Sequence, residues 1–134
     1  MEHTFKLWKG KISENSVLHE NGQCVLWTGS RSRVGYGQFR FRDPRDSPGR
    51  GHRTVTVHRM ALSLHIGNID VLPSSQASHL CNNKCCVNPA HIVFEDNFTN
   101  NSRKTCFFSN DTCSGGHIDS KGNKQPDCLV HLST

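Results

Sequence analysis

Seven cysteines and nine histidines give this chain of 134 residues many side chains that can bind a metal. They are densest in ASHLCNNKCCVNPAHIVFEDNFTNNSRKTC, residues 77–106, which also contains several asparagines. Thiolates and imidazoles bind zinc, and an imidazole close to an amide can also support hydrolysis with a hard cation. The sequence therefore raises two possibilities, a zinc-stabilised fold and a metal-dependent active site.

One set of four candidate zinc ligands is centred on a short hairpin. Cys81, Cys86 and His91 follow the spacing C-x4-C-x4-H, which lets three ligands converge on one ion. Zinc in structural sites takes four ligands in a tetrahedral arrangement, so the fourth must come from elsewhere in the chain. Cys24 is the one cysteine before residue 81, and it completes the predicted set.

A second set lies in the C-terminal part of the chain. Cys106, Cys113, His117 and Cys128 follow the spacing C-x6-C-x3-H-x10-C. His131 is an alternative to either of the last two residues of this set. We therefore expect two structural zinc ions per chain, which would use six of the cysteines and leave one to spare.

The spare thiol, Cys85, bears on the choice between zinc and disulfide bonds. An odd number of cysteines cannot pair completely, and the short spacings to histidine are typical of zinc sites. The N-terminus carries no apolar run like that of a signal peptide, and no stretch is long enough to span a membrane. We therefore expect zinc and reduced cysteines in an intracellular protein, nuclear if the organism is eukaryotic, with no membrane partner.

The composition predicts a small core and a polyanionic partner. Hydrophobic residues make up 34% of the chain, and a core of this size rarely holds a loop-rich chain without metal or disulfides. The net charge is +5, and two zinc sites of three thiolates and one imidazole would leave roughly +3. The segment from Arg31 to Arg59 contains eight arginines and only two aspartates, so the positive charge is concentrated there.

The same stretch predicts an antiparallel hairpin. Residues 36–42 and 52–58 alternate apolar and polar side chains, and the segment between them contains two prolines and two glycines. The apolar side chains expected to face the core are Phe39, Phe41, Val55 and Val57. The polar side chains expected on the outer face are Gln38, Arg40, Arg42, His52, Thr54 and Thr56. The outer face of this sheet is therefore rich in arginine.

Three further elements surround the hairpin. A helix is predicted over residues 57–66, because apolar side chains recur at i, i+3, i+4 and i+7 from Val57 and Gly67 follows. Residues 24–30 are typical of a strand closed by a turn. Residues 1–20 have no sustained period, and we expect a packing segment of one or two helical turns.

Two residues of the dense stretch, His79 and Asn100, belong to neither ligand set. The apolar stretch HIVFE predicts a strand, and a helix can begin after it at Asp96 or Asn97. A strand, a metal-tied loop, a second strand and a helix would then place His79 opposite Asn100. An imidazole there can act as a general base on water, and an amide oxygen suits Mg²⁺ rather than zinc.

These residues together carry a resemblance to a known family. The pattern SHLC-x4-C-x-N-P-x-H is followed by an asparagine nine residues on and a cysteine six residues beyond that. It resembles the His-Cys box of intron-encoded homing endonucleases, which belong to the ββα-metal (His-Me finger) nucleases. The resemblance runs from Cys24 to Cys128 and is strongest between Ser78 and Cys106. It implies a small α+β, zinc-stabilised ββα-metal fold with an antiparallel DNA-binding sheet and few helices.

We expect a single domain spanning residues 1–134. Its expected parts are an N-terminal packing segment (1–20), a DNA-binding sheet and helix (24–66), a ββα-metal core (77–106), and a second zinc loop and tail (107–134). The last part is polar and glycine-rich without a period, so its order is expected to come from the metal ligands within it.

The resemblance also implies a role for each matched residue. His79 would be the general base that activates the attacking water, and Asn100 would bind a single catalytic Mg²⁺ or similar cation. The family's phosphate-clamping arginine would be Arg50 or Arg53, and strand alternation favours Arg50. The implied zinc ligands are Cys24, Cys81, Cys86 and His91 in one site and Cys106, Cys113, His117 and Cys128 in the other. The candidate DNA contacts are Gln38, Arg40, Arg42, His52, Arg53 and Thr54.

These roles predict a sequence-specific endonuclease that hydrolyses double-stranded DNA and leaves 5′-phosphate and 3′-hydroxyl ends. One active site cuts one strand, so a homodimer on a near-palindromic site is expected for double-strand breaks. The alternative is a zinc-stabilised DNA-binding regulator on the same scaffold without cleavage, and a low-specificity nuclease is a third possibility. The presence of both His79 and Asn100 favours the enzyme.

Overall fold

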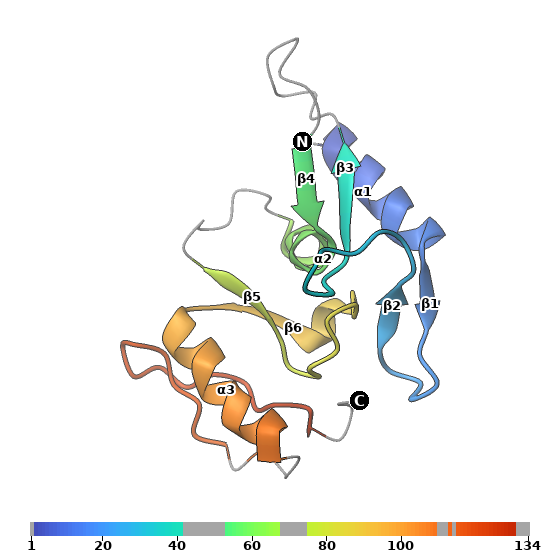
Figure 1. The fold of residues 1–134 in the computed structure, drawn as a ribbon. Helices are drawn as coiled ribbons and strands as arrows, with labels where there is room; N and C mark the ends of the chain where they lie inside the picture. The colour runs from blue at the N-terminus through green and yellow to red at the C-terminus, as the bar shows by residue number, and fades with distance from the viewer. Residues whose placement is uncertain (1, 42–52, 68–74, 110–112, 114, 131–134) are drawn as a thin grey trace.

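The computed structural model describes residues 2–41, 53–67, 75–109, 113 and 115–130 (Figure 1). The helices among them are α1 (Glu2–Glu14), α2 (Val57–Ile66) and α3 (Asn97–Ser109), with a 3-10 turn η1 (Pro89–His91). The strands form three antiparallel pairs: β1 (Ser16–Leu18) with β2 (Val25–Trp27), β3 (Gln38–Phe41) with β4 (Arg53–Thr56), and β5 (Gln76–His79) with β6 (Ile92–Glu95). This arrangement confirms the predicted small α+β fold with antiparallel strands and few helices.

The hairpin of β3 and β4 has the predicted alternation of faces. Phe39 and Phe41 are buried, whereas Arg40 and its cross-strand partner Thr54 are exposed. The period of two along each strand therefore separates a core face from a solvent face, as a half-buried sheet requires. The predicted outward residues Arg42, Arg50 and His52 lie outside the described residues, and Arg53 is described only by its backbone pairing with Phe41.

Helix α2 has the predicted bounds. Val57, Met60 and Ala61 face inward and are buried, as the i, i+3, i+4 spacing requires. The helix ends at Gly67, which has a left-handed φ of 84° and donates its backbone N–H to the carbonyl of Ser63. Glycine takes this conformation without the steric cost that a Cβ would add, so it closes the helix where the sequence predicted.

Helix α1 is longer than predicted. We expected one or two turns within residues 1–20, but the helix runs over 13 residues and is followed by β1. Its apolar side chains are few, and they converge on one buried contact: Trp8 packs edge-on against Phe41 with ring centroids 5.6 Å apart. Leu7 and Ile12 pack beside it. Tertiary burial of one tryptophan therefore stabilises a helix whose own periodicity is weak.

Trp27 fixes the loop between β2 and β3. Its indole N–H donates to the carbonyl of Ser30 at 2.9 Å. Gly29 and Gly37 lie so close to the indole that an added Cβ would come within 2.5 Å and 2.7 Å of ring atoms. The loop can therefore wrap the ring only with glycine at these two positions, and this wrapping carries Tyr36 toward β5.

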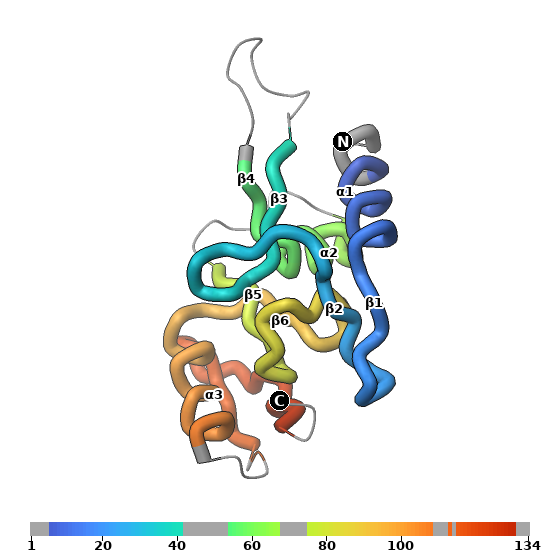
Figure 2. Tube along the Cα trace, turned by 45° about the vertical axis from the view of Figure 1, so that its right-hand side comes forward, coloured from blue at the N-terminus to red at the C-terminus, as the bar shows by residue number. Residues whose placement is uncertain are grey.

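The second half of the fold is built from β5, β6, α3 and the chain that follows (Figure 2). Helix α3 begins at Asn97, as predicted, because the Asp96 carboxylate accepts the backbone N–H of Thr99 at 2.9 Å. The same carboxylate accepts the N–H of Ser120 at 2.8 Å. The C-terminal segment thus returns beside α3. Near its end, the backbone N–H of Leu129 donates to the carbonyl of Leu80, the residue that follows β5.

The described helices include none that is both long and apolar enough to cross a membrane.

Candidate metal centres and active-site pocket

Two segments far apart in the sequence lie side by side at the first cysteine cluster. The backbone N–H of Trp27 donates to the carbonyl of Cys85 at 2.8 Å, and that of Val87 donates to the carbonyl of Val25 at 2.7 Å. This pairing aligns β2 with the loop between β5 and η1, which contains Cys85 and Cys86. Cys24, immediately before β2, is thereby placed beside the motif, as the sequence predicted.

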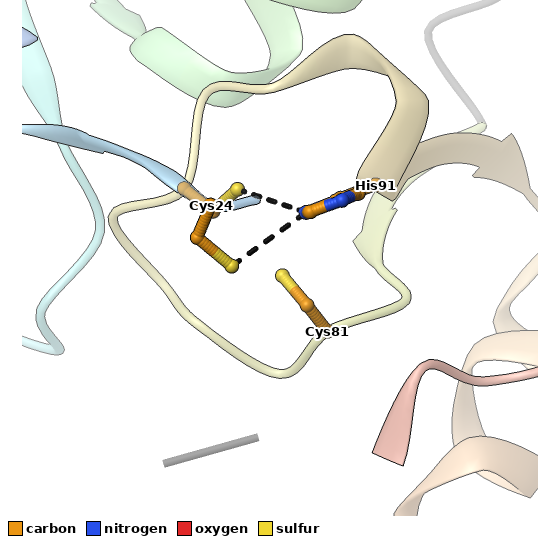
Figure 3. Close-up of side chains that lie close together, drawn as sticks. Cys24, Cys81 and His91 are labelled. Carbon is orange, nitrogen blue, oxygen red and sulfur yellow. Dashed lines mark hydrogen bonds between the residues drawn. The ribbon is translucent and has the colours of Figure 1, made fainter. Parts of the chain in front are cut away.

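The first cluster has the geometry of a tetrahedral zinc site (Figure 3). His91 Nδ1 lies 3.6 Å from Cys24 Sγ and 3.5 Å from Cys86 Sγ, and Cys81 Sγ completes a set whose ligand atoms all lie within 4.8 Å of one another. A tetrahedron with Zn–S of about 2.3 Å and Zn–N of about 2.0–2.1 Å places sulfur and nitrogen roughly 3.5–3.6 Å apart. All four residues are buried, so the cluster can hold a structural zinc.

The turn before His91 is held by hydrogen bonds of the Asn88 side chain. Asn88 caps η1 by accepting the backbone N–H of Ala90 at 3.0 Å. Its amide also donates to the carbonyl of Gln23 at 2.8 Å, which ties the turn to the chain before β2. The Asn-Pro pair identified in the sequence therefore sets the direction of His91.

The electrostatics of the first cluster favour thiolates. The side chain of Asn83 donates to Cys24 Sγ at 3.0 Å. The hydrogen bond between Cys81 and Cys86 lowers the pKa of Cys86 to about 5 and raises the pKa of Cys81. A thiolate is the form of cysteine that binds zinc, so one ligand is ready at neutral pH.

Cys85 is not part of this cluster, although it is adjacent to Cys86. Its thiol donates to the carbonyl of Gly35 at 3.3 Å, and its side chain packs against the hydrophobic core that contains Trp27 and Val87. The Cys85 side chain therefore points toward Gly35 and the core, whereas Cys86 Sγ faces His91 Nδ1 in the cluster. None of the seven cysteines, all of them among the described residues, forms a disulfide.

The second predicted set also comes together. His117 Nε2 lies 3.5 Å from Cys106 Sγ, 3.3 Å from Cys113 Sγ and 3.3 Å from Cys128 Sγ. These distances match the same tetrahedral arrangement, and all four ligand atoms lie within 4.8 Å of one another. His131, the predicted alternative, lies outside the described residues.

A serine on α3 orients the histidine of the second cluster. Ser102 Oγ donates to the carbonyl of Thr99 at 2.6 Å, so it accepts a hydrogen bond from His117 Nδ1 at 2.8 Å. The proton on Nδ1 leaves Nε2 with its lone pair directed at the thiols. Hydrogen bonds of this kind fix the tautomer and the direction of a histidine ligand.

A buried ion pair joins the second cluster to β6. Arg103, 1% exposed, forms two hydrogen bonds of 2.8 Å with the carboxylate of Glu95. It also donates to the carbonyl of Pro126 at 2.7 Å and to Cys128 Sγ at 3.4 Å. One guanidinium therefore connects the strand, α3 and the returning C-terminal segment.

His79 ends β5 and is nearly buried, with 9% of its surface exposed. Its Nε2 donates to the carbonyl of Cys86 at 2.8 Å, so the acceptor nitrogen of the neutral ring is Nδ1. Burial lowers the pKa of His79 to about 3, and the neighbouring His58 adds to this effect. The ring is therefore neutral at physiological pH and can accept a proton at Nδ1.

Two aromatic rings pack against His79. The ring of His58 lies 4.3 Å from it between centroids, and that of Tyr36 lies 6.1 Å from it at an interplanar angle of 12°. His58 is itself anchored, since its Nε2 donates to the carbonyl of Ala77 at 2.8 Å. Tyr36 and His58 thus limit the rotation of His79, and the sequence alone did not single out either of them.

The structure brings His79 and Asn100 to one pocket. This pocket, of about 140 Å³, also has Tyr36, Lys84 and Lys104 among its lining residues. The amide nitrogen of Asn100 donates to the side chain of Gln76, which leaves the Asn100 oxygen as its available acceptor. A histidine, an asparagine and two lysines lining one pocket suit a phosphate group and a hard cation.

A larger depression adjoins this pocket. It has a volume of about 450 Å³ and shares Tyr36, Ala77 and Asn100 with the first pocket. Its lining extends to Gln38 and Thr56 on the outer side of the β3–β4 hairpin. The predicted DNA-facing sheet and the predicted catalytic pair therefore open onto a shared surface.

Comparison with known proteins gives one family. A family model described as the zinc-binding loop region of homing endonuclease matches residues 23–134. The chain belongs to this family. Membership confirms the resemblance inferred from the His-Cys pattern and links the chain to nucleases. No curated protein and no solved structure matched the chain in the other two comparisons. In this homing-endonuclease family member, the two Cys₃His clusters fall within the matched residues.

Proposed function

We propose that this homing-endonuclease family member is a sequence-specific DNA endonuclease that hydrolyses phosphodiester bonds. The observation that carries the proposal is the arrangement of His79. Its Nε2 is committed to the carbonyl of Cys86, and its ring lines the same pocket as Asn100. A fixed, neutral imidazole beside an amide oxygen is what a nuclease with one cation needs in order to activate water.

In the proposed reaction, His79 accepts a proton at Nδ1 from the water that attacks the scissile phosphate. The hydrogen bond from Nε2 to Cys86 stabilises the imidazolium that results, because the carbonyl then accepts from a charged donor. Lys84 and Lys104 line the pocket and would attract the phosphate. The products would carry 5′-phosphate and 3′-hydroxyl ends.

The divalent cation would be held by Asn100. Its side-chain oxygen is uncommitted in the described contacts, whereas its nitrogen donates to Gln76, so the donor type fits Mg²⁺ or a similar cation. When bound, such a cation neutralises charge on the scissile phosphate and on the leaving 3′ oxygen. The sulfur-rich clusters suit zinc instead, and in this proposal they have a structural role.

The substrate would lie on the hairpin and the adjoining depression. Arg40 and Thr54 are exposed on the outer face, and Gln38 lines the depression. From the family resemblance we also propose Arg42, His52 and Arg53 as DNA contacts and Arg50 as the phosphate clamp. Double-strand cleavage would require two copies of this pocket, which we propose a homodimer supplies.

Cleavage is tested by incubating the purified protein with Mg²⁺ and a large pool of random-sequence duplex DNA, and by sequencing the ends. We expect cuts at a restricted set of sequences. His79→Ala should lower the cleavage rate by roughly 10²–10⁴-fold, the usual contribution of a general base. The matched control is His65→Ala, which removes an exposed histidine near the end of α2.

Each alternative gives a different result in the same assay. Sequence-selective binding without cuts in the parent would favour the regulator, and unselective cutting would favour a low-specificity nuclease. Equal cleavage by His79→Ala and the parent would show that His79 is not the base. Zinc content and melting temperature, measured for every variant, separate a chemical effect from a loss of folding.

A further inference from the structure

The amide of Asn100 is the end of a short chain of side-chain hydrogen bonds. Its Nδ2 donates to Oε1 of Gln76, and Nε2 of Gln76 donates to Oδ1 of Asn97 at 3.2 Å. All three groups are primary amides, each with a donor end and an acceptor end. This series of hydrogen bonds therefore has a direction: each amide donates to the next, from Asn100 through Gln76 to Asn97.

Gln76 is well placed to set that direction. It is the first residue of β5, where its backbone pairs with Glu95 on β6, and its side chain is half-buried. Strand β5 contacts α3, which carries Asn97 and Asn100 at i and i+3 on neighbouring positions of one helix face. The strand thus presents one amide to two residues of the helix.

The direction of the chain matters because a cation binds only the oxygen of an amide. An isolated asparagine can turn its amide by 180° with little change in shape, and half of those orientations offer the nitrogen. An acceptor held against the nitrogen removes the wrong orientation. We propose that Gln76 is the positioning residue that turns the Asn100 side-chain oxygen toward the catalytic cation, an inference that rests on the proposed function of Asn100.

The nearest competing explanation is that Gln76 contacts DNA. It lines the depression together with Gln38 and Thr56, which belong to the proposed DNA-binding face. A DNA contact would affect the affinity for DNA at any metal concentration. A positioning role would instead change the concentration of metal needed, since partners of a ligand typically alter metal affinity by 10–100-fold.

Two substitutions of Gln76 distinguish the effect of its hydrogen-bond acceptor from the effect of its side-chain size. Gln76→Met keeps the length of the side chain and removes both hydrogen bonds. Gln76→Glu keeps an acceptor for the Asn100 amide and removes only the donor to Asn97. The control is Gln23→Met, the same change at an exposed glutamine in the loop between β1 and β2. Melting temperature and zinc content verify that each variant is folded.

The first readout is metal binding without cleavage. Mn²⁺ is titrated into ¹⁵N-labelled full-length protein, and the paramagnetic broadening of the backbone amide signal of residue 100 is followed. We expect Gln76→Met to raise the half-saturating Mn²⁺ concentration about tenfold, and Gln76→Glu and Gln23→Met to leave it within about threefold of the parent. The second readout is the Mg²⁺ concentration that gives half-maximal cleavage of plasmid DNA, which should shift in parallel.

Asn100→Asp provides an internal test. A carboxylate presents two equivalent oxygens and needs no partner to choose between them. We therefore expect Gln76→Met to change the Mn²⁺ midpoint by less than about twofold in the Asn100→Asp background. The difference between the two backgrounds is the interaction between the residues, as in a double-mutant cycle.

The outcomes divide cleanly between this inference and the proposed function. Mn²⁺ midpoints that are equal in Gln76→Met and the parent overturn the positioning role, as does an absence of broadening at Asn100. A higher KM for DNA with unchanged metal dependence overturns it in favour of a DNA contact. A Mn²⁺ shift in a protein that cuts no DNA supports the positioning role and overturns the nuclease function.

Discussion

The imidazole rings of His58 and His79 lie against each other, with centroids 4.3 Å apart and planes inclined by 32°. Each ring donates from Nε2 to a backbone carbonyl at 2.8 Å, His58 to Ala77 and His79 to Cys86. Two buried imidazoles in contact cannot both carry charge at low cost, so the neutral form of both is favoured. Burial is accordingly the largest cause that lowers the pKa of His58, to about 4.

This pKa predicts how stability depends on pH. In the unfolded chain the pKa of His58 returns to about 6.5, so between pH 6.5 and 4 the unfolded state binds more protons. Stability is therefore lost as the pH falls through this window. From pH 7 to pH 5 the loss due to His58 amounts to about 2 kcal/mol in the free energy of unfolding.

The measurement is denaturant unfolding of the zinc-loaded parent and of His58→Phe across pH 5–7.5. Phenylalanine keeps a ring against His79 and does not titrate. The parent should lose about 2 kcal/mol more than the variant between pH 7 and pH 5, whatever both lose through other groups. Parallel curves for the two proteins would contradict a buried neutral His58.

The contrast between Cys81 and Cys85 predicts the metal content. Cys81→Ser removes a buried member of the first cluster, whereas Cys85→Ser changes a thiol that faces Gly35 and the core. We expect two zinc ions per chain in the parent and in Cys85→Ser, but about one in Cys81→Ser, measured by elemental analysis after purification without added metal. Loss of a zinc ion from Cys85→Ser as well would contradict the assignment.

Exposed Arg40 predicts a change in the salt dependence of DNA binding. Its side chain lies on the outer face of β3, opposite Thr54. If it contacts a phosphate, Arg40→Ala should reduce the slope of log K against log salt concentration by about 1. Fluorescence anisotropy with a labelled duplex between 50 and 300 mM salt measures the slope. Lys9→Ala on α1 removes a charge outside the hairpin and should leave the slope nearly unchanged.

Much of the fold followed from local patterns in the sequence. The alternation around Phe39 and Phe41 and the period from Val57 to Gly67 gave the hairpin and α2 with their faces, because burial on one side leaves a clear period. Both ligand sets came together as spaced in the sequence. Metal ligands must converge on a point, so their spacing is more restrictive than a hydrophobic pattern.

What the sequence did not reveal depends on contacts between distant segments. Helix α1 is stabilised by packing of Trp8 against Phe41. These residues are 33 positions apart in the sequence, so no local hydrophobic period could indicate their contact. Tyr36, His58 and Gln76 line the larger depression together only because the loop around Trp27, the first turn of α2 and the start of β5 converge. A single histidine or glutamine carries no signal of such a meeting, so these residues could be found only in the structure.

Ser102 predicts a selective weakening of the second cluster. It holds the Nδ1 proton of His117 and so directs Nε2 to the thiols. Ser102→Ala should lower the zinc affinity of this cluster by about tenfold and leave the first cluster unchanged. Competition with a chromophoric chelator should show one of two zinc ions released at lower chelator concentration. Ser13→Ala on α1 is the control, and simultaneous weakening of both sites would contradict a local role.

The Glu95–Arg103 ion pair predicts a strongly non-additive pair of substitutions. Both side chains are almost completely buried, and their two hydrogen bonds of 2.8 Å are parallel contacts between a guanidinium and a carboxylate. Arg103→Met leaves the carboxylate buried without its partner and should cost about 3–5 kcal/mol in the free energy of unfolding. Adding Glu95→Leu removes the stranded charge and should restore part of that loss. Denaturant unfolding at pH 7 of the parent, the two single variants and the double variant measures the interaction between the residues. The control is Lys104→Met, which changes the exposed neighbour of Arg103 on α3. Equal losses of stability in Arg103→Met and in this control would show that the ion pair contributes little.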